Sequence, residues 1–198
     1  FSNRTFLHKN FEILLENDHD EVITYYFKIQ SNGFADIRIA LRSIDRFIYY
    51  ALNEYFLFGL FYGMILILSL YNLLMYFAIK EIKYVYYIFY LLSVGIYSMC
   101  MDGTAFQYLW PNSPNWNQFA YGIFIYSIIL WSLLFSQRFL NTKTKAPFLH
   151  KLFSITILVR TAFFVVSLFH LKLFEHRYIE LLPLVLIFYT SIYVLVKG

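Results

Sequence analysis

Four side chains of metal-binding types lie close together near the C-terminal end of the chain: His170, Glu175, His176 and Glu180. Imidazole and carboxylate groups bind zinc, but this spacing matches no standard zinc pattern. We therefore predict no metal ion and no cofactor. The sequence also lacks a Gly-rich phosphate loop, a nucleophile elbow and paired carboxylates within its apolar runs, so we expect no catalytic site in this chain.

Arg160 is unusual because it is a charged residue inside an apolar run. A charge near the centre of a bilayer costs about 2.5–3.5 kcal/mol on the insertion scale. Apart from Glu180 at the start of the last run, no Asp or Glu lies in any apolar run. The guanidinium must therefore snorkel to the headgroups or find partners inside a bundle. We favour the bundle interior, where Asn72, tyrosine hydroxyls, helix carbonyls or acids of further helices are the candidate partners.

The stretch FGLFYGMILILSLYNLLMYF, residues 58–77, interrupts its apolar character at Gly59, Gly63 and Asn72. Gly-x-x-x-Gly allows membrane helices to approach closely, which predicts a tight contact within the bundle or in a homodimer. At 100° per residue, the glycines lie nearly opposite Asn72. The face that carries Asn72 also holds Tyr62, Ile65, Ser69 and Tyr76.

A second polar stripe follows in the next apolar run, where Tyr86, Tyr90 and Tyr97 recur with Ser93 at helical spacing. These tyrosines are typical of packing and of membrane interfaces, but they could also line a cavity or hydrogen-bond Asn72. An asparagine in hydrocarbon is less costly when a neighbouring helix bonds it. The tyrosine stripe is our first candidate for that neighbour.

Composition defines the protein class to which these residues belong. The chain is 60% hydrophobic and only 14% charged, whereas an ordinary soluble domain is about 25% charged. A soluble protein of 198 residues could not bury so much apolar surface. The net charge of +4 suits a lipid bilayer as partner, and no groove-reading motif indicates nucleic acid. Cys100 is the single cysteine, which rules out an intrachain disulfide.

The predicted fold is a mainly α, polytopic membrane helix bundle over residues 51–198. A helix needs about 20 apolar residues to cross the hydrocarbon core. Five apolar runs predict helices at 55–79, 84–101, 119–135, 152–171 and 178–196. Trp110 and Trp116, in the loop before the third helix, are predicted interfacial anchors.

The connecting loops predict the orientation of the bundle. The loops after the first and third runs carry six Lys or Arg residues, whereas the other two loops carry two. Cytoplasmic loops are enriched in Lys and Arg, so the first and third loops should be cytoplasmic. The N-terminal segment is then extracytoplasmic, and residue 198 is cytoplasmic.

Residues 1–50 predict a different structure. The stretches VITYYFKIQ and FADIRIALR alternate apolar and polar residues and flank SNG, which is typical of a β-hairpin. FEILL is a third candidate strand, and SIDRFIYYALNEY a helix or an extended linker. Because three strands are marginal alone, we expect the last strands of an antiparallel β-sandwich whose other strands lie upstream. With no initiator Met or signal segment, we expect a piece of a longer protein.

These features in this order resemble the bacterial seven-transmembrane receptors with diverse intracellular signalling modules. The resemblance is strongest from Phe58 to Pro111. It is carried by the paired glycines, by Tyr71-Asn72, by the short basic turn with tyrosines after it, and by the second loop. The residues involved are Gly59, Gly63, Tyr71, Asn72, Tyr84, Tyr86, Tyr87, Gly103, Gln107, Trp110 and Pro111.

The resemblance implies seven helices, of which five are seen, in the cell inner membrane. It also implies that residues 11–45 end an extracytoplasmic sensor domain similar to carbohydrate-binding modules. Any kinase, cyclase or phosphatase module would follow residue 198. The leading hypothesis is a sensor that relays binding of an extracytoplasmic ligand, carbohydrate or a related small molecule, to that module. A transporter or channel with a fused outer domain is the alternative, and a membrane enzyme ranks third.

Overall fold

The computed structural model describes residues 8–15, 22–29, 39–169 and 181–197. The described part of the chain contains seven helices, five of them long. They are α1 (Ile44–Ile79), α2 (Ile82–Asp102), α3 (Thr104–Tyr108), α4 (Pro114–Phe139), α5 (Thr142–Lys145), α6 (Pro147–Phe169) and α7 (Leu181–Lys197).

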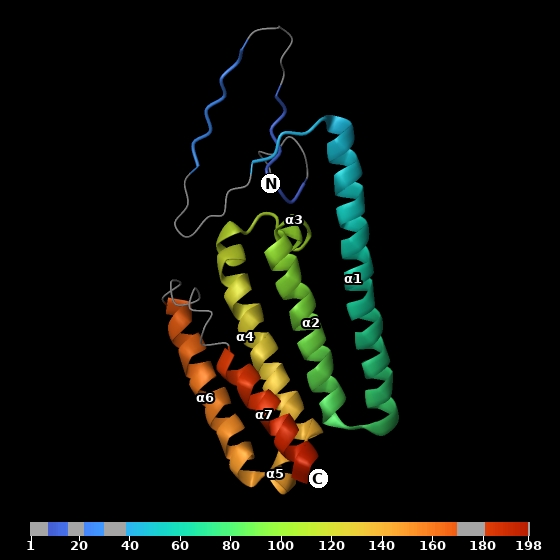
Figure 1. Ribbon diagram of the computed structural model, residues 1–198, viewed down its shortest axis with the longest axis vertical. Helices are drawn as coiled ribbons and strands as arrows, with labels where there is room; N and C mark the ends of the chain where they lie inside the picture. Colours follow the sequence, from blue (N-terminus) through green and yellow to red (C-terminus); the bar gives the residue numbers. More distant parts are fainter. Residues whose placement is uncertain (1–7, 16–21, 30–38, 170–180, 198) are drawn as a thin grey trace.

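The long helices lie side by side and roughly parallel to one axis (Figure 1). α1 stands at one edge and packs against α2, α2 packs against α4, and α4 packs against α6 and α7. The short helices mark the two ends of the bundle: α3 lies at one end with the N-terminal segment, and α5 lies at the other with the C-terminus. We call these the α3 end and the α5 end.

The predicted polytopic helical bundle is confirmed. Four helices, α1, α2, α4 and α6, are long and apolar enough to cross a membrane. α7 has 17 residues, or about 26 Å at 1.5 Å per residue, slightly less than the hydrocarbon core of about 30 Å. The described part of the chain therefore holds four candidate spans and one shorter apolar helix, where the sequence predicted five spans.

The helix boundaries differ most at the start of α1. The segment SIDRFIYYALNEY is helical, so α1 has 36 residues and is about 54 Å long. No Gly or Pro interrupts residues 44–58, which explains why the helix begins so early. The two short helices were not predicted. α3 follows directly after Gly103, and a single residue, Ala146, separates the end of α5 from Pro147 at the start of α6.

The predicted strands are not confirmed. None of the described residues before α1 is assigned to a strand. Residues 22–29 are all exposed, and short strands need a partner sheet or a packed face to be stable. Most of the second stretch and the whole of the predicted SNG turn lie outside the described residues.

Helix packing relies on small polar side chains that bond back to their own helix. Ser69, Ser93, Ser167 and Thr190 are buried, and each hydroxyl donates to the carbonyl four residues earlier. Such bonds satisfy polar groups where no water is present. Between α4 and α6 the core is apolar, formed by Ile129, Leu133 and Phe153 with Ile157, Leu186 and Ile187 around them.

Candidate functional site at the α3 end of the bundle

The N-terminal segment docks on α1 through Lys9. Its Nζ lies 2.8 Å from Glu54 Oε1 and 4.5 Å from the centre of the Phe58 ring. The Lys9 side chain is 8% exposed and that of Glu54 20%. An ion pair removed from water to this degree is geometrically defined, unlike a solvated surface pair.

His8 lies beside this ion pair and packs its ring against α1. Its centroid is 5.2 Å from that of Phe47 and 5.8 Å from that of Tyr55, both edge to face. His8 is buried. Its Nδ1 accepts a hydrogen bond from the backbone N–H of Asn10 and lies 3.2 Å from Glu12 Oε1. The segment 8–12 is therefore held by aromatic packing as well as by charge.

The turn between α2 and α3 forms the other side of the junction. Gly103 caps α2 with φ +80°, a conformation that favours glycine. A Cβ placed on Gly103 would lie 3.6 Å from Cβ of Lys9. The segment that binds α1 through its ammonium group thus also contacts the α2–α3 turn.

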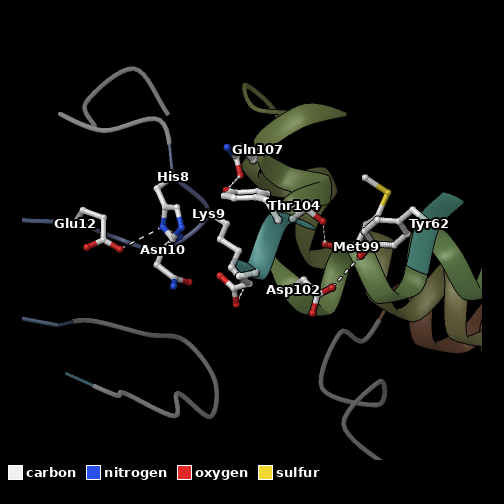
Figure 2. A network of polar contacts seen from close by, with 11 residues as sticks. His8, Lys9, Asn10, Glu12, Tyr62, Met99, Asp102, Thr104 and Gln107 are labelled. Carbon is white, nitrogen blue, oxygen red and sulfur yellow. Dashed lines mark hydrogen bonds and ion pairs between the residues drawn. The ribbon is translucent and has the colours of Figure 1, made fainter. Parts of the chain in front are cut away.

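Two hydrogen bonds from α1 tie it to the same turn (Figure 2). The Tyr55 hydroxyl donates to Gln107 Oε1 at 2.8 Å, and the Tyr62 hydroxyl donates to Asp102 Oδ2 at 2.9 Å. Thr104 Oγ1 donates to the carbonyl of Met99 at 3.4 Å.

The predicted interfacial tryptophans lie at this end too. Trp110 Nε1 donates to Asn117 Oδ1 at 2.9 Å, and its ring stands edge to face with that of Trp116. Trp116 is 43% exposed. Trp110 therefore holds the loop onto the start of α4, while Trp116 lies on the surface.

The tyrosine stripe of α2 faces α4, so our first candidate for the neighbour of Asn72 was wrong. Tyr86 packs on Trp131, the Tyr97 hydroxyl donates to that of Tyr121, and Ser93 bonds Ser127. Tyr90 stacks on Tyr87 of its own helix. α1 instead packs on the opposite face of α2, which carries Gly95.

Gly95 is the glycine that lies against α1. It is buried, and a Cβ there would lie 3.5 Å from two Ile65 side-chain carbons. Gly95 is nearly opposite the tyrosine stripe at 100° per residue. α1 therefore packs on the small face of α2, and the bulky stripe fills the space toward α4.

Asn72 lies on the buried face of α1, together with Ile65 and Ser69. Its Nδ2 donates to the carbonyl of Leu68 at 2.8 Å. The amide donor is thus satisfied by the preceding turn of its own helix. Gly59 and Gly63 have no atom within 4 Å of a Cβ placed on them. Within the described part of the chain, the glycine in van der Waals contact with a neighbouring membrane helix is Gly95.

Arg160 is 7% exposed, and its Cζ lies 5.6 Å from the centre of the Phe163 ring. It is thirteen residues beyond Pro147 in α6, about 20 Å along the helix. Snorkelling to the α5 end would need to bridge most of that distance. The guanidinium lies inside the bundle, and a role there stays a prediction.

Sequence reasoning missed most of the junction. Lys9 and Glu54 are separated by 45 positions, and neither belongs to a local motif. The sequence did mark Asp102 and Gln107 as residues at the end of a membrane helix. Asp102 directly follows an apolar run, and Gln107 lies in the loop after it. His170, Glu175, His176 and Glu180 lie outside the described residues. Among the residues that the structure describes, no three His, Cys, Asp or Glu side chains cluster so that they could hold a metal ion.

The fold and the junction together define a class of protein. Apolar helices long enough to cross a bilayer place it in the membrane, and a partly buried polar network joins a segment outside the bundle to two of those helices. The family described as 7TM diverse intracellular signalling matches residues 54–198. The chain belongs to this family of multi-pass membrane proteins with a signalling role. No curated protein and no solved structure matches it.

Proposed function

We propose that the chain is the membrane-spanning part of a sensor that passes the state of an extracytoplasmic ligand-binding segment to the opposite side of the membrane. A carbohydrate or a related small molecule is the ligand that we would test first. The output, a kinase, cyclase or phosphatase module, would lie outside this chain. The inner membrane of a bacterium is the proposed location.

One observation supports this proposal most directly: Lys9 contacts α1 and the α2–α3 turn at once. Its ammonium group pairs with Glu54, and its Cβ lies against Gly103. A displacement of the N-terminal segment must therefore move or break contacts with both elements. A passive tether would not need an ion pair that is largely withdrawn from water at this point.

α1 is suited to carry such a displacement. It is a single helix of 36 residues that joins the junction to the α5 end (Figure 1). Its buried face meets α2 through Ile65, Ser69 and Asn72, which we propose as the moving seam. The ligand must bind the two arrangements unequally, because equal affinity shifts no equilibrium.

The distribution of charge supports the proposed orientation. The α5 end carries Lys80 and Lys83 where α1 turns into α2, and four further cations from the last turn of α4 to the second turn of α6. The α2–α4 connection, residues 103–113, has neither Lys nor Arg. Cytoplasmic loops are enriched in these residues, so the α5 end would be cytoplasmic and the junction extracytoplasmic.

The full-length protein in liposomes tests this proposal against the transporter alternative. A panel of soluble glycans is added on the junction side, and both solute flux and output activity are measured. We expect glycan-dependent output without flux, and loss of that response in Lys9→Met. Lys83→Met is the matched control, because its partner Glu81 is exposed.

Two results would count against this reasoning. Saturable flux of a glycan would favour transport. Cysteine crosslinks between α1 and α2 that form equally with and without the activating glycan would exclude movement between these helices at Asn72.

A further inference from the structure

A cluster of cations lies at the α5 end, where α4 turns through α5 into α6. We call it the basic corner, formed by Arg138, Lys143, Lys145 and Lys151. All four side chains are exposed. No Asp or Glu occurs anywhere from residue 103 to residue 169, so no acid of these helices neutralises the corner.

The corner is rigidly built beneath its charges. Thr142 is fully buried, and its Oγ1 donates to the carbonyl of Gln137 at 3.2 Å and lies 3.0 Å from His150 Nδ1. Asn141 precedes it in the left-handed conformation, with φ 48°. Ala146 is also buried. Because positions 142 and 146 face the bundle, Lys143 and Lys145 are held on the outer surface.

The corner lies at the level expected for headgroups. α6 has 23 residues and is about 34 Å long, close to the hydrocarbon thickness of about 30 Å. Lys151 lies in the second turn of α6, Arg138 in the last turn of α4, and Lys143 and Lys145 in α5 between them. Phe139 and Phe148 beside them are 59% and 77% exposed. Exposed apolar rings beside Lys and Arg are typical of segments that lie in the membrane interface.

We propose that the basic corner binds the phosphate groups of anionic phospholipids in the leaflet at the α5 end. Four cations with no Asp or Glu on α4, α5 or α6 supply the charge, and the two exposed rings enter the acyl boundary. A Lys or Arg near an anionic surface contributes about fivefold in affinity. This inference is independent of the ligand and of the output proposed above.

Native mass spectrometry of the full-length protein tests this proposal. The detergent-solubilised protein is titrated with phosphatidylglycerol or phosphatidylcholine, and bound lipids are counted. We expect a preference for phosphatidylglycerol that falls about 25-fold in Lys143→Gln/Lys145→Gln. The variant Lys143→Arg/Lys145→Arg keeps the charge and should retain binding, which separates charge from misfolding.

A matched control removes two cations from the other connection at the same end. Lys80→Gln/Lys83→Gln should weaken binding less than twofold, because Glu81 already pairs with Lys83 and neither lysine belongs to the basic corner. Equal losses in the two double variants would overturn the proposal, since lipid would then respond only to net charge. Equal binding of phosphatidylcholine, or displacement by millimolar inorganic phosphate, would overturn it as well.

Discussion

The ion pair between Lys9 and Glu54 should control whether the N-terminal segment stays docked on the bundle. Its side chains are 8% and 20% exposed, and a hydrogen bond involving a charged group contributes about 1.5–3 kcal/mol. Lys9→Met and Glu54→Gln should therefore each shift the docking equilibrium roughly 10- to 100-fold toward the undocked state. In Glu54→Gln, the Lys9 ammonium still lies over the Phe58 ring, and this cation–π contact is worth about 0.5–1 kcal/mol. Glu54→Gln should therefore be milder than Lys9→Met.

Spin labels can report the docking equilibrium directly. Ile13 and Leu109 are 62% and 51% exposed, which makes them suitable labelling positions on the segment and beside α3. Cys100 is the only native cysteine and is replaced by Ala in the background. In nanodiscs, the populations of short and long distances between the two spin labels give the docking free energy for each single variant and for the double variant.

The double-mutant cycle separates the pair from the individual side chains. We expect a coupling of about 1.5–3 kcal/mol that changes little with salt, because a buried pair is poorly screened. An equivalent cycle on Lys83 and Glu81, whose side chains are 28% and 52% exposed, should give about 0–1 kcal/mol. A coupling below about 0.5 kcal/mol for Lys9 and Glu54 would show that the pair behaves as a solvated one. The proposal that Lys9 transmits a displacement of the N-terminal segment to α1 would then fail.

Three further tests address the packing of the bundle. Gly95→Leu should destabilise the bundle by about 1–3 kcal/mol through overpacking against α1, as measured by reversible unfolding in mixed micelles. Gly59→Leu is the control and should leave the stability nearly unchanged. A larger loss of stability in Gly59→Leu would indicate a glycine contact outside the described residues. Arg160→Leu should impair folding or output of the full-length protein, and retention of both would exclude a role inside the bundle. Thr142→Val should cost about 1–2 kcal/mol through its two lost hydrogen bonds, measured in the same micelles against the exposed Thr144→Val, and equal effects would contradict the buried geometry.

The sequence predicted the bundle well because hydropathy is a local property. A run of about 20 apolar residues must become a helix in a bilayer, where every backbone polar group needs a partner. The same logic predicted the buried face of α1, because a 3.6-residue period places Ile65, Ser69 and Asn72 on one side. It could not predict how far α1 extends, since the segment before residue 55 is helical without being continuously apolar.

Sequence reasoning was least reliable where it had to choose partners. Gly59 and Gly63 form the recognisable motif, yet the glycine that meets a neighbouring helix is Gly95. The tyrosine stripe was expected to face α1, but it faces α4. A single periodic pattern shows that a helix has a special face. It carries no information about which of several helices will cover that face.

The sequence alone determined the class of the protein, the helical nature of its membrane part and the unequal charge of its two ends. Each of these follows from composition and short-range periodicity. Only the tertiary structure brought Lys9 to Glu54 and to the α2–α3 turn, and assigned α2's two faces to α1 and α4. Contacts between residues 45 or more positions apart depend on how whole helices pack, and side-chain volume on opposing faces decides that packing.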